Sequence, residues 1–255
     1  MDASEQNRLA WNKEASENNY WTRAVGEDEL KEAREGRVKI RILPNEELPL
    51  SWLREIKGKT LALASGGGQE GPLLAAMGSS VIVTDISDAQ LERDREVASK
   101  YHLDLKCMQC DLGLPFPFED NSFDSIINPI SINFTPNAKH VWKECSRVLK
   151  KGGVLITAFA NPVMYIFDVP SLAKGKMKIK YTLPFDADKA YTEKQKKKIQ
   201  KDGETMEYSH TLNTLLGDLC KSGFIIKDLM TGGSDFEPVD SFIQDCYIAL
   251  LATKV

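Results

Sequence analysis

Two carboxylates and a glycine-rich turn stand at the ends of predicted buried strands in this sequence. Asp85 closes the apolar run 80–85, and Asp111 follows the apolar run 103–108. The turn 65–68 follows a strand predicted over 59–64. Small residues let a backbone approach a ligand closely, and a following helix offers its N-terminus. This pattern predicts the opening of a nucleotide-binding βαβ unit.

The glycine spacing leaves the identity of the ligand open. Gly66, Gly68 and Gly71 fit the dinucleotide pattern GxGxxG, and Asp85 lies 19 residues after Gly66, close to the ~20 expected for an acid on an NAD ribose. Pro72 requires that the next helix begin there, which its first position allows. Because the pattern by itself is a weak signal, an NAD enzyme stays an alternative.

Apolar runs separated by amphipathic helices predict the fold that positions these residues. We expect strands at 59–64, 80–85, 103–108, 123–128, 153–160, 224–230 and 243–252, and helices at 70–77, 87–101, 136–149 and 210–221. This order indicates an α/β, Rossmann-like, seven-stranded sheet that is mostly parallel, with helices on both faces. The final helix–strand–strand unit indicates an antiparallel last strand. Ser87 and Gln90 predict a capping box, and residues 150–153 predict the end of helix 136–149.

We expect a single domain made of four segments: an N-terminal arm (1–50), a core (51–160), an inserted lid (161–208) and a C-terminal helix and strands (209–255). The arm predicts either two surface helices or a cover over the ligand, with Tyr20 or Trp21 facing the substrate; a short strand is expected within 37–50. The lid is too long for a simple connection and follows a strand's carboxyl end, where open α/β sheets bind ligands. It is therefore expected to shape a substrate pocket.

Composition narrows the class of protein. The chain has 255 residues and a net charge of −4, which gives no global reason to bind nucleic acid. Five cysteines predict reduced thiols, and Cys107 and Cys110 lack the further ligands of a zinc site, so no metal is expected. No apolar run approaches the ~20 residues of a membrane span, which predicts a cytoplasmic protein without membrane contact.

The sheet edge and the C-terminal unit resemble those of class I S-adenosylmethionine-dependent methyltransferases, from about Trp11 to the C-terminus. The sequence is most similar to the branch related to quinone-biosynthesis enzymes, in particular through LASGGGQEGPLLAAMG, DISDAQLERDR and VWKECSRVLKKGGVLI. The resemblance implies S-adenosylmethionine as cofactor and a small-molecule methyl acceptor as partner. It leaves the oligomeric state open.

The resemblance also implies a cofactor site. Ala64, Ser65 and Gly66 would lie against the methionine half, Asp85 would accept hydrogen bonds from the ribose, and Ile86 would lie beside the adenine. Asp111 and the Leu112 amide would bind the adenine edge, and Asn128 would lie near the sulfonium; Gln69 and Pro129 complete the expected set. The bland alternatives are that Asp85 caps the next helix and that Asp111 stabilises a turn before Gly113.

Two residues depart from the family pattern. Ala62 stands where an acid usually anchors the cofactor's ammonium group, and Ala64 stands where the first loop glycine is usual. These departures put the affinity and the loop geometry in question.

Methyl transfer from a sulfonium is an in-line displacement that needs alignment more than a covalent intermediate. His210, preceded by Glu207, and Tyr20 are candidates to orient or deprotonate the acceptor; a structural capping role for the His210 segment is an equal alternative. Asn128-Pro129-Ile130-Ser131 is similar to the motif of base-methylating enzymes but lacks its second proline and stacking aromatic.

Two other functions stay open. The first is an RNA or protein methyltransferase, for which the lysine-rich run 194–198 would be a docking face; the run otherwise predicts a solvated helix face. The second is a non-catalytic, cofactor-binding regulatory protein, supported by Ala62.

Overall fold

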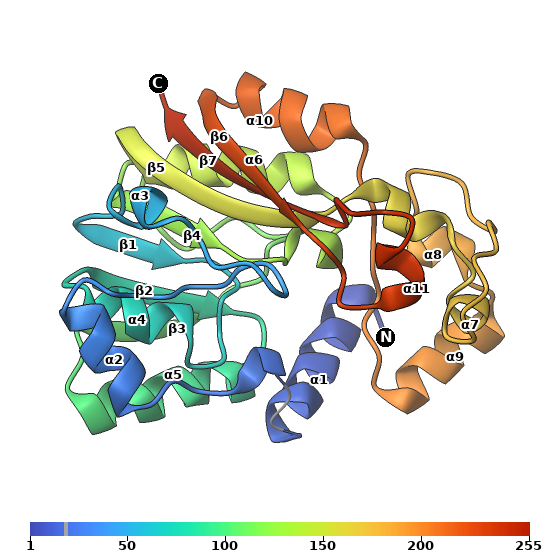
Figure 1. The fold of residues 1–255 in the computed structure, drawn as a ribbon, viewed down its shortest axis with the longest axis horizontal. Coiled ribbons are helices and arrows are strands. Elements are labelled where there is room, and N and C mark those ends of the chain that lie inside the picture. Colours follow the sequence, from blue (N-terminus) through green and yellow to red (C-terminus); the bar gives the residue numbers. More distant parts are fainter. Residues whose placement is uncertain (18–19) are drawn as a thin grey trace.

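The computed structural model describes residues 1–17 and 20–255, without the side chain of Tyr20. Its sheet has seven strands in the order β3-β2-β1-β4-β5-β7-β6 (Figure 1). The strands are β1 (Lys59–Ala62), β2 (Ser80–Asp85), β3 (Leu105–Gln109), β4 (Phe123–Asn128), β5 (Leu149–Ala160), β6 (Phe224–Gly232) and β7 (Tyr247–Lys254). Adjacent strands run parallel except at β7, which is antiparallel to β5 and β6. The predicted sheet with an antiparallel last strand is confirmed.

Two hydrophobic cores cover the two faces of the sheet, because successive side chains of a strand point to opposite faces. Leu61 of β1 belongs to one core and Ala62 to the other. The core of Ala62 includes residues of α2 (Glu27–Arg34), α3 (Leu50–Leu53), α4 (Glu70–Ala76) and α5 (Asp88–Tyr101). The core of Leu61 includes residues of α6 (Ala138–Val148) and α10 (Asp218–Lys221). Helices therefore pack on both faces, as predicted.

The prediction of a short strand within 37–50 is wrong. Val38, Ile40 and Ile42 are buried and the basic residues between them are exposed, which is the alternation of a strand. The segment nevertheless lies over one face of the sheet, packed in the core of Ala62, and does not extend an edge. Within this segment the Leu48 amide donates to the Ile40 carbonyl at 2.8 Å.

Element boundaries differ from the prediction where local contacts decide them. β1 ends at Ala62 because the chain turns at Ala64, whose φ is +47°. β5 begins at Leu149, so residues 150–153 belong to the strand and do not close a helix. The Ser87 hydroxyl caps α5 by accepting from the Gln90 amide at 3.1 Å. The predicted helix 210–221 is a π-helical turn, η4 (Asn213–Gly217), followed by α10.

Residues 161–208 lie beyond the carboxyl end of β5 and contain η3 (Pro162–Ile166), α7 (Val169–Leu172), α8 (Ala187–Ala190) and α9 (Glu193–Asp202). We call them the lid; they have a small core of Phe185, Ala187, Ile199 and Met206. Helix α1 (Ala3–Ser16) lies between α5 and the lid (Figure 1). The remaining short elements are η1 (Tyr20–Thr22), η2 (Ile132–Phe134) and α11 (Glu237–Asp240).

No helix in the described part of the chain is both long and apolar enough to cross a membrane.

Candidate functional site

A cavity of about 1110 Å³ opens at the carboxyl ends of the parallel strands. Its walls come from α1, the glycine-rich turn, the ends of β2 and β3, the segment after β4, and the lid. Nine residues of the predicted cofactor set line it: Ala64, Ser65, Gly66, Gln69, Asp85, Ile86, Asp111, Leu112 and Pro129. Residues far apart in the sequence thus meet at one site because parallel strands end at a common edge.

The amides of the glycine-rich turn are bound by carboxylates of the protein itself. Gly66 N donates to Asp85 Oδ2 at 3.0 Å, and Gly67 N and Gly68 N donate to Asp94 Oδ2 at 2.9 and 3.1 Å. A pyrophosphate would need these same amides and would meet two acids instead. The geometry therefore disfavours the dinucleotide interpretation of the glycine pattern.

Gly66 is held between two neighbouring side chains. A Cβ at this position would lie 2.7 Å from Gln90 Cβ, which is closer than real Cβ contacts, and 3.0 Å from Asp85 Cβ, which is tighter than most. The absence of a side chain therefore lets the turn press against the end of β2. Ala64 adopts a left-handed φ of +47°, which favours glycine, at the position where the family usually has glycine.

Asp85 is half-buried at the end of β2 and accepts two backbone hydrogen bonds, from Gly66 N at 3.0 Å and from Ser87 N at 2.9 Å. The second bond is the capping interaction considered for Asp85, and it coexists with a position on the cavity wall. Burial raises the pKa of Asp85 to about 6, against the backbone hydrogen bonds, which lower it.

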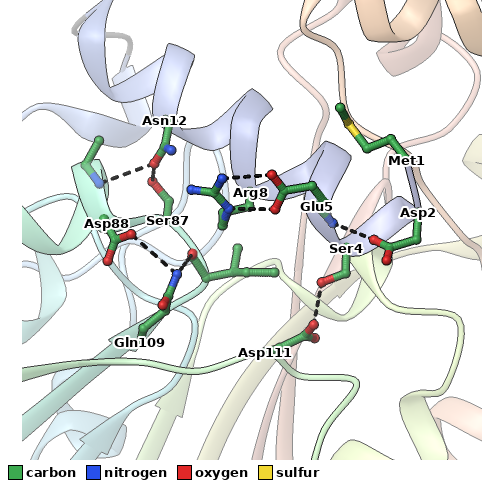
Figure 2. Close-up of polar contacts among 12 residues, drawn as sticks. Met1, Asp2, Ser4, Glu5, Arg8, Asn12, Ser87, Asp88, Gln109 and Asp111 are labelled. Atoms are coloured by element: carbon green, nitrogen blue, oxygen red, sulfur yellow. Dashed lines mark hydrogen bonds and ion pairs between the residues drawn. The ribbon is translucent and has the colours of Figure 1, made fainter.

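Asp111 follows β3, and both of its carboxylate oxygens have partners. Gly113 N donates to Oδ1 at 2.7 Å, which is the turn interaction considered for this residue, and the Ser4 hydroxyl of α1 donates to Oδ2 (Figure 2). Asp111 also lines the cavity. The N-terminal helix therefore contacts the acid that the resemblance assigns to the adenine.

Helix α1 is fixed to the same edge at a second point. Asn12 Oδ1 accepts from Ser87 Oγ at 2.6 Å and from Ala89 N at 3.3 Å, at the start of α5 (Figure 2). The Arg93 guanidinium donates to the Ala15 carbonyl at 2.9 Å. Contacts of this kind place the N-terminal arm over the predicted cofactor edge.

The opposite side of α1 is bound to the lid and to η2. Asn7 is 2% exposed; its Oδ1 accepts from Met206 N at 2.6 Å, and its Nδ2 donates to the carbonyls of Met206 and Phe134 at 3.0 and 3.1 Å. Gln6 Nε2 donates to the Glu204 carbonyl at 2.8 Å. Helix α1 is thus a bridge between the cofactor edge and the lid.

Glu70, which the sequence did not single out, supplies a buried acid beside the turn. It is 7% exposed, lines the cavity, and accepts from Ser65 Oγ at 3.0 Å. Burial raises its pKa to about 7. Ala62, where the family usually has an acid, is buried in the core. Glu70 is a carboxylate near the turn that could pair with a cationic group of a ligand.

Asn128 is buried and does not lie on the cavity wall as the structure describes it. Its Nδ2 donates to the Leu63 carbonyl at 2.8 Å and to Ser131 Oγ at 2.6 Å, and its Oδ1 accepts from Thr157 Oγ1 at 3.0 Å. Because both amide atoms are engaged between strands, Asn128 fixes the end of β4. This position does not support the role of the asparagine in base-methylating enzymes.

Aromatic rings form the lid side of the cavity. Tyr165 stacks on Phe185 with centroids 5.6 Å apart, and Phe185 meets Tyr181 and Tyr191 edge-on at 5.0 and 5.5 Å. Trp11 of α1 meets Phe134 edge-on at 5.3 Å. All of these residues line the cavity.

One carboxylate, Glu207, lies within this aromatic wall. Its Oε2 accepts from the Tyr165 hydroxyl at 2.7 Å, and its Oε1 accepts from Thr205 Oγ1 at 3.3 Å. Asn133 Nδ2 in turn donates to the Tyr165 oxygen at 2.6 Å, and Asn133 Oδ1 accepts from Ala160 N at 3.2 Å. Burial raises the pKa of Glu207 above its usual value. The sequence places Glu207 three residues before His210 but gives no local pattern that would have singled it out.

Of the two predicted catalytic residues, His210 is not brought to this wall. His210 is buried outside the cavity, with Nε2 3.1 Å from the Ile132 carbonyl oxygen, and burial lowers its pKa. These contacts agree with the structural alternative for His210. The side chain of Tyr20 lies outside the described residues. Its neighbour Trp21 does line the cavity.

The lysine run 194–198 lies on α9, where Lys196 pairs with Glu193 at 3.3 Å and Lys198 pairs with Asp202. Pairs within one turn of an exposed helix are typical of a solvated face.

Cys110 is buried and Cys107 is half-buried, and the described residues contain no group of side chains suited to a metal ion.

Comparison with known proteins gives a consistent result. Residues 61–157 match the family model described as "Methyltransferase domain". The chain is 36% identical over 243 residues to the uncharacterized methyltransferase YbaJ of Bacillus subtilis, covering 95% of this chain and 93% of that protein. It is 29% identical over 109 residues to demethylmenaquinone methyltransferase of Bacillus cereus, covering 42% and 43% of the two chains. An S-adenosylmethionine-dependent methyltransferase structure from Mesorhizobium loti has a TM-score of 0.61 at 16% identity, covering 80% and 96% of the two chains.

Proposed function

Because the chain belongs to the S-adenosylmethionine-dependent methyltransferases, we propose that it transfers the cofactor's methyl group to a small molecule held against the aromatic wall of the cavity. The observation that carries this proposal is the composition of one cavity. One side contains the predicted cofactor residues, and the other contains aromatic side chains of the lid. Its volume of about 1110 Å³ exceeds the range of roughly 300–1,000 Å³ usual for one ligand. Cofactor and acceptor can therefore share it.

The residues present suit a cofactor that is cationic and carries no phosphate. The turn amides are already bound by Asp85 and Asp94, which leaves no phosphate cradle. Glu70 and Asp85 are acids that burial makes harder to ionise, and a cationic ligand would offset that cost. We assign Asp85 and Ile86 to the ribose and adenine, Asp111 and Leu112 to the adenine edge, and Ala64, Ser65, Gly66 and Gln69 to the methionine half. Pro129 is placed beside the reacting groups.

The bound cofactor supplies a methyl group that positively charged sulfur has already activated. The protein's task is to align the acceptor with that methyl group and to keep water out. Helix α1 and the lid lie beyond the strand ends (Figure 1) and supply part of the cavity wall, which suits them to this task. The described acidic lining also favours a small neutral or cationic acceptor over a nucleic acid backbone.

Calorimetry with S-adenosylhomocysteine tests the cofactor site. Replacing Asp85 by Ala removes a carboxylate at the proposed ribose position and should weaken binding by ~1.5 to 3 kcal/mol, roughly tenfold to a hundredfold or more. Asp88→Ala is the matched control, because Asp88 is exposed three residues later and lies off the cavity wall as described. Equal affinity of both variants and the unmodified protein would remove Asp85 from the site.

A further inference from the structure

Glu207 stands apart from the other acids of the cavity because it lies among aromatic rings. Both hydrogen bonds that the structure gives its carboxylate come from neutral hydroxyls, those of Tyr165 and Thr205. Within residues 1–17 and 20–255, no ion pair to a lysine, arginine or histidine is found for it. Glu207 is half-buried, and a carboxylate partly withdrawn from water without a counter-charge is stabilised when a ligand provides one.

The orientation of Glu207 is fixed by a chain of hydrogen bonds from the end of the sheet. Ala160 N holds Asn133 Oδ1, Asn133 Nδ2 holds the Tyr165 oxygen, and the Tyr165 hydroxyl donates to Glu207. Asn133 belongs to η2, which follows β4 and the residues 129–131 on the cavity wall. The carboxylate is therefore positioned relative to the edge where the cofactor residues lie.

The charge of the cavity lining also favours a cationic ligand. Nine aspartates and glutamates line it, whereas Lys13 is the one basic residue among its described lining residues. Such a lining attracts cations and repels anions. Aromatic faces around a carboxylate are also a favourable environment for an ammonium group.

From this geometry we infer that the acceptor is an amine, and that Glu207 binds its nitrogen and receives its proton before transfer. The inference rests on the proposed function. A bound ammonium first gives one proton to the Glu207 carboxylate, which frees the electron pair of the nitrogen, and Glu207 later passes this proton to water. A new bond then forms between the neutral nitrogen and the methyl carbon while the carbon–sulfur bond breaks and its electron pair stays on sulfur. The methylated nitrogen carries the positive charge. Burial raises the pKa of Glu207, which makes its carboxylate a stronger base than an exposed one.

The acceptor class can be tested with S-adenosylmethionine labelled in its methyl group. Soluble metabolites are divided by ion exchange into cationic, neutral and anionic fractions, and each is incubated with the complete protein. Label should enter the cationic fraction. Label confined to the neutral or anionic fraction would overturn the amine assignment alone. If no fraction is labelled while S-adenosylhomocysteine still binds, the proposed methyl transfer itself fails.

Variants test the role of Glu207 on the labelled fraction. Glu207→Gln should lower the transfer rate at least a hundredfold while the affinity for S-adenosylhomocysteine stays within about twofold. Glu207→Asp, which keeps the carboxylate, should recover part of the rate. Glu193→Gln is the control on the same lid, since that side chain is 83% exposed and lies off the described cavity wall. A Glu207→Gln protein that binds S-adenosylhomocysteine and transfers at the unmodified rate would overturn the role.

Discussion

Ala64 carries a backbone conformation that an alanine adopts at a cost. Its φ is +47° just before the turn 65–68, where the resemblance to methyltransferases leads us to expect glycine. The left-handed region costs a residue with a Cβ roughly 1–2 kcal/mol, part of which glycine loses again through its freer unfolded chain. Ala64→Gly should therefore raise the free energy of unfolding by about 0.5–1 kcal/mol in urea titration.

Ala62→Gly is the control two residues earlier, in the buried strand β1. It should lower the free energy of unfolding, because glycine loses more freedom in a strand and leaves a small void. The strain at Ala64 would be refuted if both variants were equally destabilised.

Glu70 should make the ligand-free protein less stable as the pH rises. Its folded-state pKa of about 7 lies above the ordinary value of 4.5, so the folded state holds the proton more tightly than the unfolded state. The stability contribution is complete below pH 4.5 and is lost as the pH rises to about 7, by up to about 3 kcal/mol. Glu70→Gln should flatten this part of the dependence and stabilise the protein at pH 8.

Urea unfolding between pH 5.5 and 8 measures this effect. Glu92→Gln is the matched control, because Glu92 is an exposed acid on α5 paired with Arg95. It should retain the slope of the unmodified protein. If Glu70→Gln retained that slope as well, Glu70 would ionise normally in the folded state.

At the scale of one element, α1 derives its position from Asn7. The Asn7 amide makes three hydrogen bonds to the backbone of Met206 and Phe134 in a buried place. Asn7→Ala leaves those backbone groups without partners and should lower the free energy of unfolding by about 2 kcal/mol or more. Glu5→Ala on the same helix breaks an exposed ion pair with Arg8 and should change it by less than about 1 kcal/mol. Equal effects of the two variants would show that the hydrogen bonds of Asn7 do not hold α1 in place.

The elements that the sequence predicted best are those specified by local pattern. The segments 80–85 and 123–128 each have an apolar centre, and their strands have the predicted bounds. Asp85 and Asp111 could be placed at the cavity because carboxyl ends of parallel strands share one edge. The segment from Val38 to Ile42 shows the limit of the same reasoning. It was predicted as a strand, but it packs on one face of the sheet and joins neither edge.

The lid side of the cavity depends on contacts that no local pattern encodes. Asn7 meets Met206 across 199 residues of sequence, and Tyr165 meets Glu207 across 42. The sequence predicted His210, at the junction of the lid and the C-terminal helix, as a candidate to orient or deprotonate the acceptor. Packing decides otherwise, since the His210 ring is buried against the Ile132 carbonyl while Glu207 lies on the cavity wall.

On the scale of the whole molecule, three separate parts of the chain close one cavity: α1, the strand ends and the lid. Each of the three parts supplies residues of the cavity wall that the other two do not. The sides that we propose for the cofactor and the acceptor therefore belong to one continuous cavity, and α1 contributes to both.

The bridging of α1 has a kinetic consequence. Its Ser4 lies on Asp111 and its Asn7 on the lid, so a nucleoside that occupies the Asp111 edge sets the helix against which the acceptor then binds. We expect ordered addition, with S-adenosylmethionine entering first and S-adenosylhomocysteine leaving last. Product inhibition should then be competitive toward the cofactor and noncompetitive toward the acceptor. Competition between S-adenosylhomocysteine and the acceptor would contradict this order. Helix α1 would then line the cavity without coupling the two binding steps.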